Sequence, residues 1–360
     1  MAGDSIGKLF RVTNWGESHG PMIGAVVEGC PSGLELSEAD LQPALDRRKP
    51  GQSKIVTQRK EGDKVQIVSG LVDGVTTGTP ISLQIVNQDQ KSKDYSNIAN
   101  LYRPSHGDFT YQQKYGIRDI AGGGRTSARV TAPSVAAGAI AEKLLFNRHQ
   151  IKITAWVESV QDLSCDVNPE EVSREQVESN IVRCPDPDMA ELMIQRIEET
   201  RKQGDSLGGV VACCIQSVPV GLGEPVFDKL EADLAHAMLS INASKGFEFG
   251  SGFSGTLMRG SEHNDQFISE NNNIVTTTNH SGGIQAGISN GMPITFKVAF
   301  KPVATLLQKQ QTVTKEGEAV EYQVKGRHDP CVLPRAVPIV EAMAALVLCD
   351  HSIRYFGNKL

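Results

Sequence analysis

Residues 122–141 read GGGRTSARVTAPSVAAGAIA, in which three glycines, two arginines and hydroxyl residues precede an apolar, alanine-rich run. The run predicts a helix over about 132–147, and its low polarity predicts that this helix is buried. Backbone N–H groups of a glycine turn at a helix start point toward an anion, and an arginine offers a planar fork to phosphate oxygens. The stretch therefore predicts a core helix with an anion cradle at its entrance.

A second stretch of this kind lies near the other end of the chain. Gly326-Arg327-His328-Asp329 precedes another long apolar helix, predicted over about 335–356, and each helix has a proline near its start, Pro133 or Pro338. The pair indicates a faint internal duplication. It would place two Gly-Arg turns at comparable positions in two half-structures, facing one pocket.

Alternating or β-branched runs predict six strands, at residues 22–29, 64–72, 80–87, 151–160, 208–218 and 293–300. Shorter helices are predicted to open at Ser37, Asp188 and Asp228, because each is an N-cap residue with an acid three positions later. No linker rich in proline, serine or charge divides the chain. We therefore expect one α+β domain over residues 1–360, with helices packed against antiparallel sheets.

The charge distribution favours a small anionic ligand. The 360 residues carry a net charge of -6, which argues against a general nucleic-acid binder. Residues 46–60 nevertheless hold six bases and one acid, whereas residues 158–205 hold thirteen acids and five bases. A locally cationic site in an acidic protein suits a compact anion. The alternative explanation of this uneven charge is that the two segments form solvated faces of opposite sign.

The N-terminus and the cysteines indicate a cytoplasmic protein. The segment MAGDSIGKLFRV lacks the basic start and apolar stretch of a secretory signal, and no run of 18 apolar residues predicts a membrane span. The seven cysteines are dispersed and never form a C-x-x-C pair. They predict buried thiols rather than disulfides, and no metal site is expected.

Two motif matches fail on their context. Residues 16–20, GESHG, match the nucleophile elbow G-x-S-x-G, but no sheet precedes them and a β-like run follows. Residues 250–255, GSGFSG, match the dinucleotide fingerprint, but no helix follows them. No Walker A sequence occurs. A hydrolase, a Rossmann enzyme and a P-loop kinase are therefore not supported.

Four polar clusters rich in glycine or proline remain: GESHG with His19, RPSHGD with His106, the stretch at 122–127, and KGRHDPC with Asp329. Histidines transfer protons near neutral pH, and Asp329 could accept a proton or orient a base. The clusters predict an enzyme that acts on a phosphorylated, carboxylated small molecule. Isomerase, lyase and transferase stay open at this point, as does a glycine turn that merely lets Arg125 reach a buried carboxylate.

These clusters resemble the signature segments of the chorismate synthase family. The matching segments, which run in the family's order from residue 7 to about 350, are GKLFRVTNWGESHGPMIG, DRRKPG, RPSHGDFTYQQKYGIRDIAGGGRTSAR, GLGEPVFDKLEADLAHAMLSINASKGFEFG, NHSGGIQAGISNG, KPVATL and KGRHDPCVLPRAVPIVEAM. The resemblance implies a carbon–oxygen lyase acting on phosphates. It would convert 5-enolpyruvylshikimate 3-phosphate to chorismate by anti-1,4-elimination of phosphate and a ring proton, with reduced FMN and no net redox change. This reaction is the last common step of the shikimate pathway to the aromatic amino acids.

The resemblance also implies roles for individual residues. His19 would protonate the departing phosphate, His106 would protonate or stabilise the reduced flavin near its N1 and O2 edge, and Asp329 would act with flavin N5 in removing the ring proton. The residues that would hold the substrate are Arg48, Lys54 and Arg129. The residues that would hold FMN are Arg125, Thr126, Ser127, Asn242, Ala243, Ala286, Lys301, Pro302, Val303, Ala304, Thr305 and Arg327.

Position 54 departs from the family's pattern, since Lys54 stands where arginine is expected and so loses bidentate geometry. Thr126 likewise stands where serine is common. The family fold implies a β-α-β sandwich and a homotetramer. NADPH is expected to serve only indirectly, through an external flavin reductase. Residues 306–326 are predicted to form a mobile loop near the site.

Two rival functions stay open. One is a flavin-dependent oxidoreductase acting on a phosphorylated carboxylic acid, which would consume one reductant per product. The other is a non-catalytic scaffold that binds anions or RNA through residues 46–60 and would survive the loss of both histidines. No membrane partner and no nucleic-acid partner is expected for the favoured function.

Overall fold

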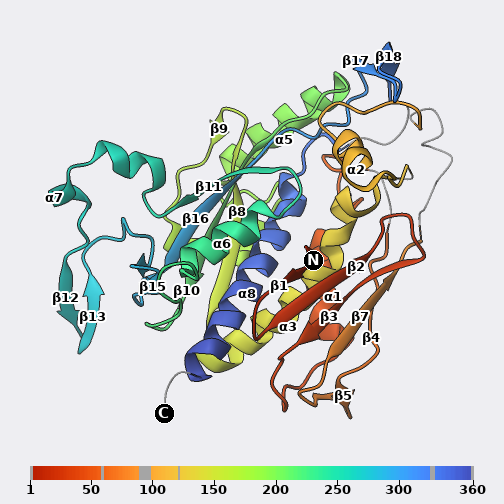
Figure 1. The fold of residues 1–360 in the computed structure, drawn as a ribbon. Coiled ribbons are helices and arrows are strands. Elements are labelled where there is room, and N and C mark those ends of the chain that lie inside the picture. Colours follow the sequence, from red (N-terminus) through yellow and green to blue (C-terminus); the bar gives the residue numbers. More distant parts are fainter. Residues whose placement is uncertain (1–2, 58–60, 89–98, 121, 325–328, 358–360) are drawn as a thin grey trace.

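Two five-stranded antiparallel sheets enclose a layer of helices in the computed structural model, which describes residues 3–57, 61–88, 99–120, 122–324 and 329–357 (Figure 1). The first sheet has the order β1 (Ser5–Ile6), β2 (Arg11–Gly16), β3 (Met22–Glu28), β7 (Ile81–Val86), β4 (Val65–Ile67). The second has the order β11 (Ser244–Phe249), β16 (Ile294–Phe300), β10 (Gly209–Gln216), β8 (Lys152–Val160), β9 (Leu163–Ser164).

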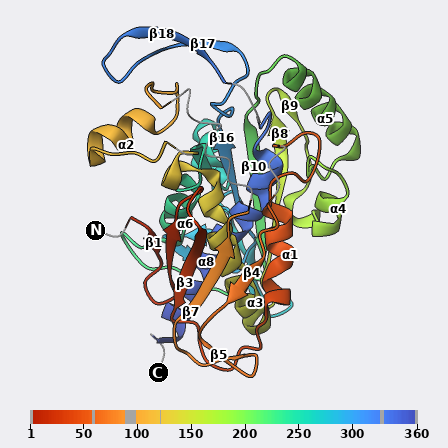
Figure 2. The ribbon, with the colours of Figure 1, turned by 90° about the vertical axis from the view of Figure 1, so that its right-hand side faces the viewer.

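The helix layer is built around the two apolar helices that the sequence predicts. Helix α3 (Thr131–His149) packs on strands β2, β3 and β7, and helix α8 (Leu333–Gly357) packs on β8 and β10. The two helices pack against each other, and α1 (Glu38–Arg48) and α6 (Leu230–Leu239) lie beside them (Figure 2). This arrangement confirms the predicted β-α-β sandwich.

Helix α8 is long and apolar enough to cross a membrane by length and hydropathy alone. Within the span Leu333–Tyr355, 94% of an apolar 18-residue stretch is buried inside the protein, between the second sheet and the other helices. Protein therefore covers the surface that lipid would have to touch, and α8 is the central core helix. The seven cysteines are also buried, as predicted, and none is in a disulfide.

The two halves share one topology, which supports the duplication inferred from the helix entrances. The first half runs β2, β3, α1, β4, β7, α3, and the second runs β8, β10, α6, β11, β16, α8. The sheet orders β2-β3-β7-β4 and β8-β10-β16-β11 correspond strand by strand, and every pairing within them is antiparallel. Helices α3 and α8, which follow the two Gly-Arg stretches of the sequence, are thus equivalent.

Further elements are inserted into this frame. Helical ones are α2 (Asp108–Tyr115), α4 (Arg174–Glu178), α5 (Pro187–Lys202), α7 (Gly260–His263) and the 3-10 turns η2 (Gly124–Thr126), η3 (Ala128–Val130), η4 (Pro169–Glu171) and η5 (Gly252–Leu257). The short strands form hairpins: β5 (Leu71–Val72) with β6 (Val75–Thr76), β12 (Phe267–Glu270) with β13 (Asn273–Thr276), β14 (Ile284–Gln285) with β15 (Ile288–Ser289), and β17 (Lys309–Val313) with β18 (Ala319–Gln323).

All six predicted strand regions contain strands, although the region 64–72 is divided between β4 and β5 near Gly70, whose φ is +87°. Ser37 and Asp40 form the expected capping box of α1. Helix α5 is capped by Asp186 instead of Asp188, because Pro187 takes the first helical position. The prediction that Asp228 caps α6 is wrong, because the N-cap is Lys229, and the Asp228 carboxylate pairs with Arg354 at 3.0 Å.

The prediction of a mobile loop over residues 306–326 is wrong for its described part. Residues 309–323 form the β17–β18 hairpin at the top of the molecule (Figure 1). Most side chains of this hairpin are polar, so it shows no hydrophobic alternation. Residues 325–326 lie outside the described residues.

Candidate active site

The GESHG turn meets the glycine stretch in space. His19 lies in the turn between β2 and β3, and its Nδ1 is 3.0 Å from the Ser18 hydroxyl. Gly122 has a φ of +73°, and a Cβ built at this position would overlap the His19 imidazole. A glycine is therefore required where the cradle passes the histidine. The turn joins two antiparallel strands, which confirms that it is no nucleophile elbow.

His106 lies beside the same stretch. A Cβ built at Gly107 would lie 2.8 Å from Thr126 Cγ2, so the RPSHGD loop packs directly on the GGGRTS turn. His106 Nδ1 donates to the Pro104 carbonyl at 3.0 Å, because that oxygen can only accept. The Nε2 atom is 3.0 Å from the Thr305 hydroxyl, which belongs to the predicted flavin segment.

The surroundings of His106 keep its imidazole neutral. Burial lowers the pKa of His106 to about 4, and the positive charges of Arg103 and Lys301 act in the same direction. Arg103 itself is held by a two-pronged ion pair with Asp108, at 2.8 Å for each contact. The loop thus presents a neutral ring, with its proton on Nδ1, next to fixed positive charge.

Two predicted substrate-binding arginines converge on one carboxylate. Arg48 and Arg129 are buried, and both form ion pairs with Asp63, which is buried between them. Burial lowers the pKa of Arg48 to about 10, although Asp63 opposes that shift. The two guanidinium groups keep the pKa of Asp63 below its usual value despite its burial. Glu61 is also buried and lies 3.8 Å from Arg129, so the two guanidinium groups face two carboxylates.

One nitrogen of the Arg129 guanidinium makes no hydrogen bond with the described residues. Its Nε donates to Asn87 Oδ1 at 2.9 Å, and its Nη1 contacts Asp63. Its Nη2 is buried and makes no hydrogen bond with the described residues, although Glu61 Oε2 lies 3.8 Å away. A buried donor without an acceptor is costly, and an anionic ligand would supply one.

Asp329 is joined to this cluster through α8. Its Oδ2 accepts from Arg335 Nη1 at 2.8 Å, and Arg335 Nε lies 3.5 Å from the Arg48 carbonyl. The segment that carries the predicted proton acceptor therefore lies next to the arginine pair. Arg327, predicted to hold FMN, lies outside the described residues.

Several predicted FMN-binding residues surround one cavity. Arg125, Thr126 and Asn242 line a cavity of about 430 Å³, and Asn242 Nδ2 donates to the Thr126 carbonyl at 2.9 Å. Arg125 pairs with Asp4 and donates to the Gly16 carbonyl at 2.8 Å. Arg125 thus reaches a carboxylate, as expected if the glycine turn has only a structural role. The Asp4 side chain is, however, 57% exposed and not buried.

The segment from Lys301 to Thr305 follows β16 and returns to the same region. The Lys301 N–H donates to the Ala243 carbonyl at 3.0 Å, and its Nζ donates to the Ser105 carbonyl at 3.1 Å. The Val303 carbonyl accepts from the Ser206 hydroxyl at 2.7 Å. These contacts bring Asn242, Ala243 and the segment 301–305 to the His106 loop. Pro302 and Ala304 lie within that segment.

Two predicted site residues are not brought to this region. Lys54 is exposed and pairs with Glu198 on α5. Ala286 lies in the β14–β15 turn before β16 begins, whereas Lys301 follows its end. Seven strand residues span roughly 23 Å, so Ala286 and Lys301 lie at opposite ends of β16. The roles of Lys54 and Ala286 stay predictions.

The prediction that the glycine turn lies directly at a helix start is wrong. The turns η2 and η3 stand between Gly122–Gly124 and α3. Ser127 caps η3 by accepting from the Arg129 N–H at 3.3 Å. The positive end of the α3 dipole therefore lies at Thr131, next to Arg48 Nη1 at 3.4 Å, and not at the glycines.

Asp63, Asn87 and Arg335 connect the site, but none was predicted from the sequence. Asp63 belongs to an acidic pair that follows the basic run, and Arg335 is a charge at the start of an apolar helix. These two signals were available. Asn87 follows a strand and carries no local signal that distinguishes it from other loop amides.

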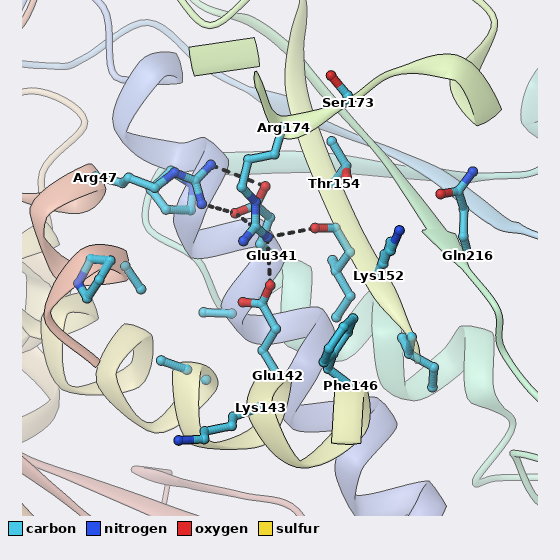
Figure 3. Close-up of a pocket in the computed structure, with 18 of the residues that line it drawn as sticks. Arg47, Glu142, Lys143, Phe146, Lys152, Thr154, Ser173, Arg174, Gln216 and Glu341 are labelled. Carbon is cyan, nitrogen blue, oxygen red and sulfur yellow. Dashed lines mark hydrogen bonds and ion pairs between the residues drawn. The ribbon is translucent and has the colours of Figure 1, made fainter. Parts of the chain in front are cut away.

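A larger cavity, of about 830 Å³, lies between α1, α3, α8 and β8, apart from these residues (Figure 3). Its buried Glu341 accepts from Arg47 and from the Ala155 N–H at 3.1 Å. Arg174 bridges Glu142 at 2.7 Å and Glu341 at 3.6 Å. Because these charges are matched against each other, we assign them to stability.

The structure is an α+β sandwich in which loop histidines lie near the buried Arg48–Arg129 pair. Among the described residues, no group of three or more His, Cys, Asp or Glu side chains could hold a metal ion. The chorismate synthase family model matches residues 10–353. The chorismate synthase of Crocosphaera subtropica is 59% identical over 357 residues, 99% of this chain and 98% of the relative.

The chorismate synthase of Christiangramia forsetii is 59% identical over 360 residues and covers both chains completely. A crystal structure of chorismate synthase superimposes with a TM-score of 0.77 at 32% identity, over 98% of this chain and 94% of that one. This chain therefore belongs to the chorismate synthase family, whose members are carbon–oxygen lyases acting on phosphates.

Proposed function

We propose that this chain converts 5-enolpyruvylshikimate 3-phosphate to chorismate by an FMN-dependent anti-1,4-elimination of phosphate and a ring proton. This is the last common step of the shikimate pathway to the aromatic amino acids. Family membership supports the reaction. The observation that carries it is the meeting of the His19 turn, the His106 loop and the GGGRTS turn beside the Arg48–Arg129 pair.

The buried arginines suit the substrate's phosphate and carboxylates. Asp63 pairs with both Arg48 and Arg129, and a ligand anion would compete with Glu61, which lies 3.8 Å from Arg129 Nη2. Arg129 Nη2 makes no hydrogen bond with the described residues and would donate to an anion that reaches it. Fixed donors that meet charge developing on a leaving group contribute about 3 kcal/mol each. His19 would protonate the departing phosphate. The exposed Lys54 would add a positive charge at the outer edge of the site.

The residues around the smaller cavity fit a flavin phosphate and ring. Gly122, Gly123 and Gly124 all have positive φ, and a Cβ built at each would overlap a side chain, of His19, Thr126 and Asp119 respectively. Arg125, Thr126, Ser127 and Asn242 would hold the cofactor there, together with residues 301–305. Reduced FMN supplies the electron-rich ring that the elimination requires.

His106 and Asp329 would handle protons at the flavin. His106 is neutral in the free protein, with its proton on Nδ1. A bound anionic flavin would raise its pKa, because an opposite charge favours the protonated ring. Arg335 Nη1 donates to Asp329 Oδ2 at 2.8 Å and so holds the carboxylate in place for its proposed role as a proton acceptor.

We further propose a single-domain, cytoplasmic homotetramer that depends on an external flavin reductase. Both large sheets are antiparallel throughout, whereas the Rossmann fold that commonly binds NADPH is built from parallel βαβ units. The part of the molecule around η5, α7 and β12–β13 projects from the sandwich (Figure 1). It exposes large apolar side chains that suit contact with other copies: Phe253, Leu257, Phe267 and Ile274.

Anaerobic incubation with reduced FMN and 5-enolpyruvylshikimate 3-phosphate tests the proposal. We expect one phosphate released per chorismate formed, with reductant needed only to prime the flavin. A flavin-dependent oxidoreductase would instead consume one reductant per product.

Variants at the two histidines test the assignment of catalytic groups. His19→Ala and His106→Ala are expected to stay folded and to release phosphate at least about 100-fold more slowly, as expected for loss of an acid–base group. Unchanged turnover in both variants would overturn the assignment of His19 and His106 as catalytic groups.

A further inference from the structure

Asn87 lies at the junction between the His19 turn and the arginine pair. It is 7% exposed and directly follows β7, which pairs with β3, the central strand of the first sheet. Its Nδ2 donates to the Glu17 carbonyl at 3.1 Å and to the Gly20 carbonyl at 2.8 Å. These two carbonyls lie on either side of His19 in the chain, so one amide group closes the turn that carries the histidine.

The other end of the same side chain holds Arg129. The Oδ1 atom of Asn87 accepts from Arg129 Nε at 2.9 Å, while Asp63 binds Nη1 of the same guanidinium. Two fixed contacts at different atoms set the plane of a guanidinium. The remaining atom, Nη2, is the buried donor without a hydrogen bond to the described residues. Its direction is thus fixed by Asn87 and Asp63 together.

The backbone of Asn87 makes this arrangement rigid. Its N–H donates to the Pro21 carbonyl at 3.1 Å, which extends the β3–β7 ladder by one bond beyond the pair Met22 and Val86. The amide is therefore placed by the sheet rather than by a loop. Among natural side chains of this length only asparagine offers both two donors and an acceptor here, because aspartate cannot donate when ionised and leucine offers neither.

We propose that Asn87 is a positioning residue for the elimination: its amide fixes the His19 turn and the Arg129 guanidinium relative to each other. The inference rests on the proposed function, in which Arg129 holds the substrate and His19 delivers a proton to the departing phosphate. A misplacement of about 1 Å between such groups can reduce a rate on the order of 100-fold. Asn87 itself touches neither substrate nor proton in this scheme.

A double-mutant cycle tests the coupling with the full-length protein, reduced FMN and 5-enolpyruvylshikimate 3-phosphate. Asn87→Ala is expected to lower kcat by roughly 10- to 100-fold in the native background. In a His19→Ala background, followed as phosphate release at high enzyme concentration, it is expected to lower kcat by less than about 3-fold, because the group that it positions is gone.

Two further variants keep the test decisive. Asn87→Asp preserves volume and the acceptor toward Arg129 but removes both donors, so it is expected to fold and to lose kcat like Asn87→Ala. Gln88→Ala alters the exposed amide next in the chain and is expected to leave turnover unchanged. Each variant's kcat is normalised to folded protein, measured by circular dichroism and thermal midpoint.

The outcomes separate this inference from the proposed function. An equal loss of kcat from Asn87→Ala in both backgrounds would mean a general structural role and would overturn the inference alone. Native kcat in Asn87→Asp would also overturn it. If His19→Ala left turnover unchanged, the catalytic assignment of His19 would fail first, and the coupling would fail with it.

Discussion

Gly138 of α3 and Ala342 of α8 are in direct contact where the two core helices pack together. A Cβ built at Gly138 would lie 2.5 Å from the Ala342 Cβ and 2.7 Å from its Cα. The helices therefore approach more closely than any residue other than glycine would allow. Because each helix packs on a different sheet, this contact sets the separation of the two halves that form the site.

Gly138→Ala is expected to destabilise the protein, although alanine favours a helix by about 1 kcal/mol over glycine. The added methyl must push the helices apart, and overpacking of this kind costs about 1–3 kcal/mol. The thermal midpoint measures the net effect. Gly260→Ala in α7 is the control, because a Cβ there meets nothing within 4 Å. A Gly138→Ala protein as stable as native would show that the helix layer can expand freely.

The sequence was most informative where burial is complete. Helices α3 and α8 were recognisable because they are apolar on nearly every side, and β3, β7, β8, β10 and β16 because their apolar residues alternate or run continuously. Strand β11, with the sequence SKGFEF, and the hairpin β17–β18 were missed. Polar residues and glycine interrupt the pattern there, and pairing with a neighbouring strand decides the structure.

The site was predictable to the extent that its residues lie in short glycine-rich clusters. His19, His106 and the GGGRTS turn are recognisable in this way, and the structure brings them together. Asp63 and Asn87 were missed because each is a single residue whose partners lie elsewhere in the chain. Arg129 is 66 residues from Asp63 and 42 from Asn87, and only the fold creates those contacts.

Removal of the buried carboxylate at Glu341 is expected to be among the more damaging changes outside the site. Glu341→Ala would leave Arg47 and Arg174 without their shared partner, which costs about 3–5 kcal/mol when one member of a buried ion pair is lost. Glu341→Gln keeps an acceptor and should cost less. Chemical denaturation measures both against Glu175→Ala, an exposed acid on α4. If Glu341→Ala and Glu175→Ala are equally stable, water takes the place of the Glu341 carboxylate as the partner of Arg47 and Arg174.

The stability of the free protein is expected to fall on acidification, beginning with His106. Its folded pKa of about 4 lies below the ordinary value of 6.5, so the unfolded chain binds the proton more readily. The contribution of His106 is complete above about pH 6.5 and is lost as the pH falls toward 4. The shift corresponds to roughly 3 kcal/mol. Asp63, whose pKa is also lowered, adds a second loss at still lower pH.

Thermal midpoints of native protein and His106→Asn, measured from pH 7.5 to 4, check this expectation. The difference in thermal midpoint between the two proteins should change between pH 6.5 and pH 4 and be constant above pH 6.5, because asparagine does not titrate. Parallel curves would mean that His106 binds its proton equally well in the folded state. An imidazole titration by NMR locates the same pKa directly.

Arg129 and Lys54 are expected to differ sharply in their effect on substrate binding. Arg129→Lys keeps the charge opposite buried Asp63 but removes the planar fork that reaches Asn87 and Asp63 together, so KM for the phosphorylated substrate should rise at least about 10-fold. Lys54 is exposed, and its pair with Glu198 is of the surface kind that contributes about 0–1 kcal/mol. Lys54→Ala should therefore raise KM by less than about 5-fold, and that effect should shrink at high salt.

Initial rates at low and high ionic strength separate the two residues. A larger rise in KM for Lys54→Ala than for Arg129→Lys would mean that the substrate binds among the exposed charges of residues 46–57. The buried pair would then be a structural ion cluster. A dominant, salt-insensitive effect at Arg129 would instead place the substrate's charge at the buried Arg48–Arg129 pair, where Arg129 Nη2 makes no hydrogen bond with the described residues.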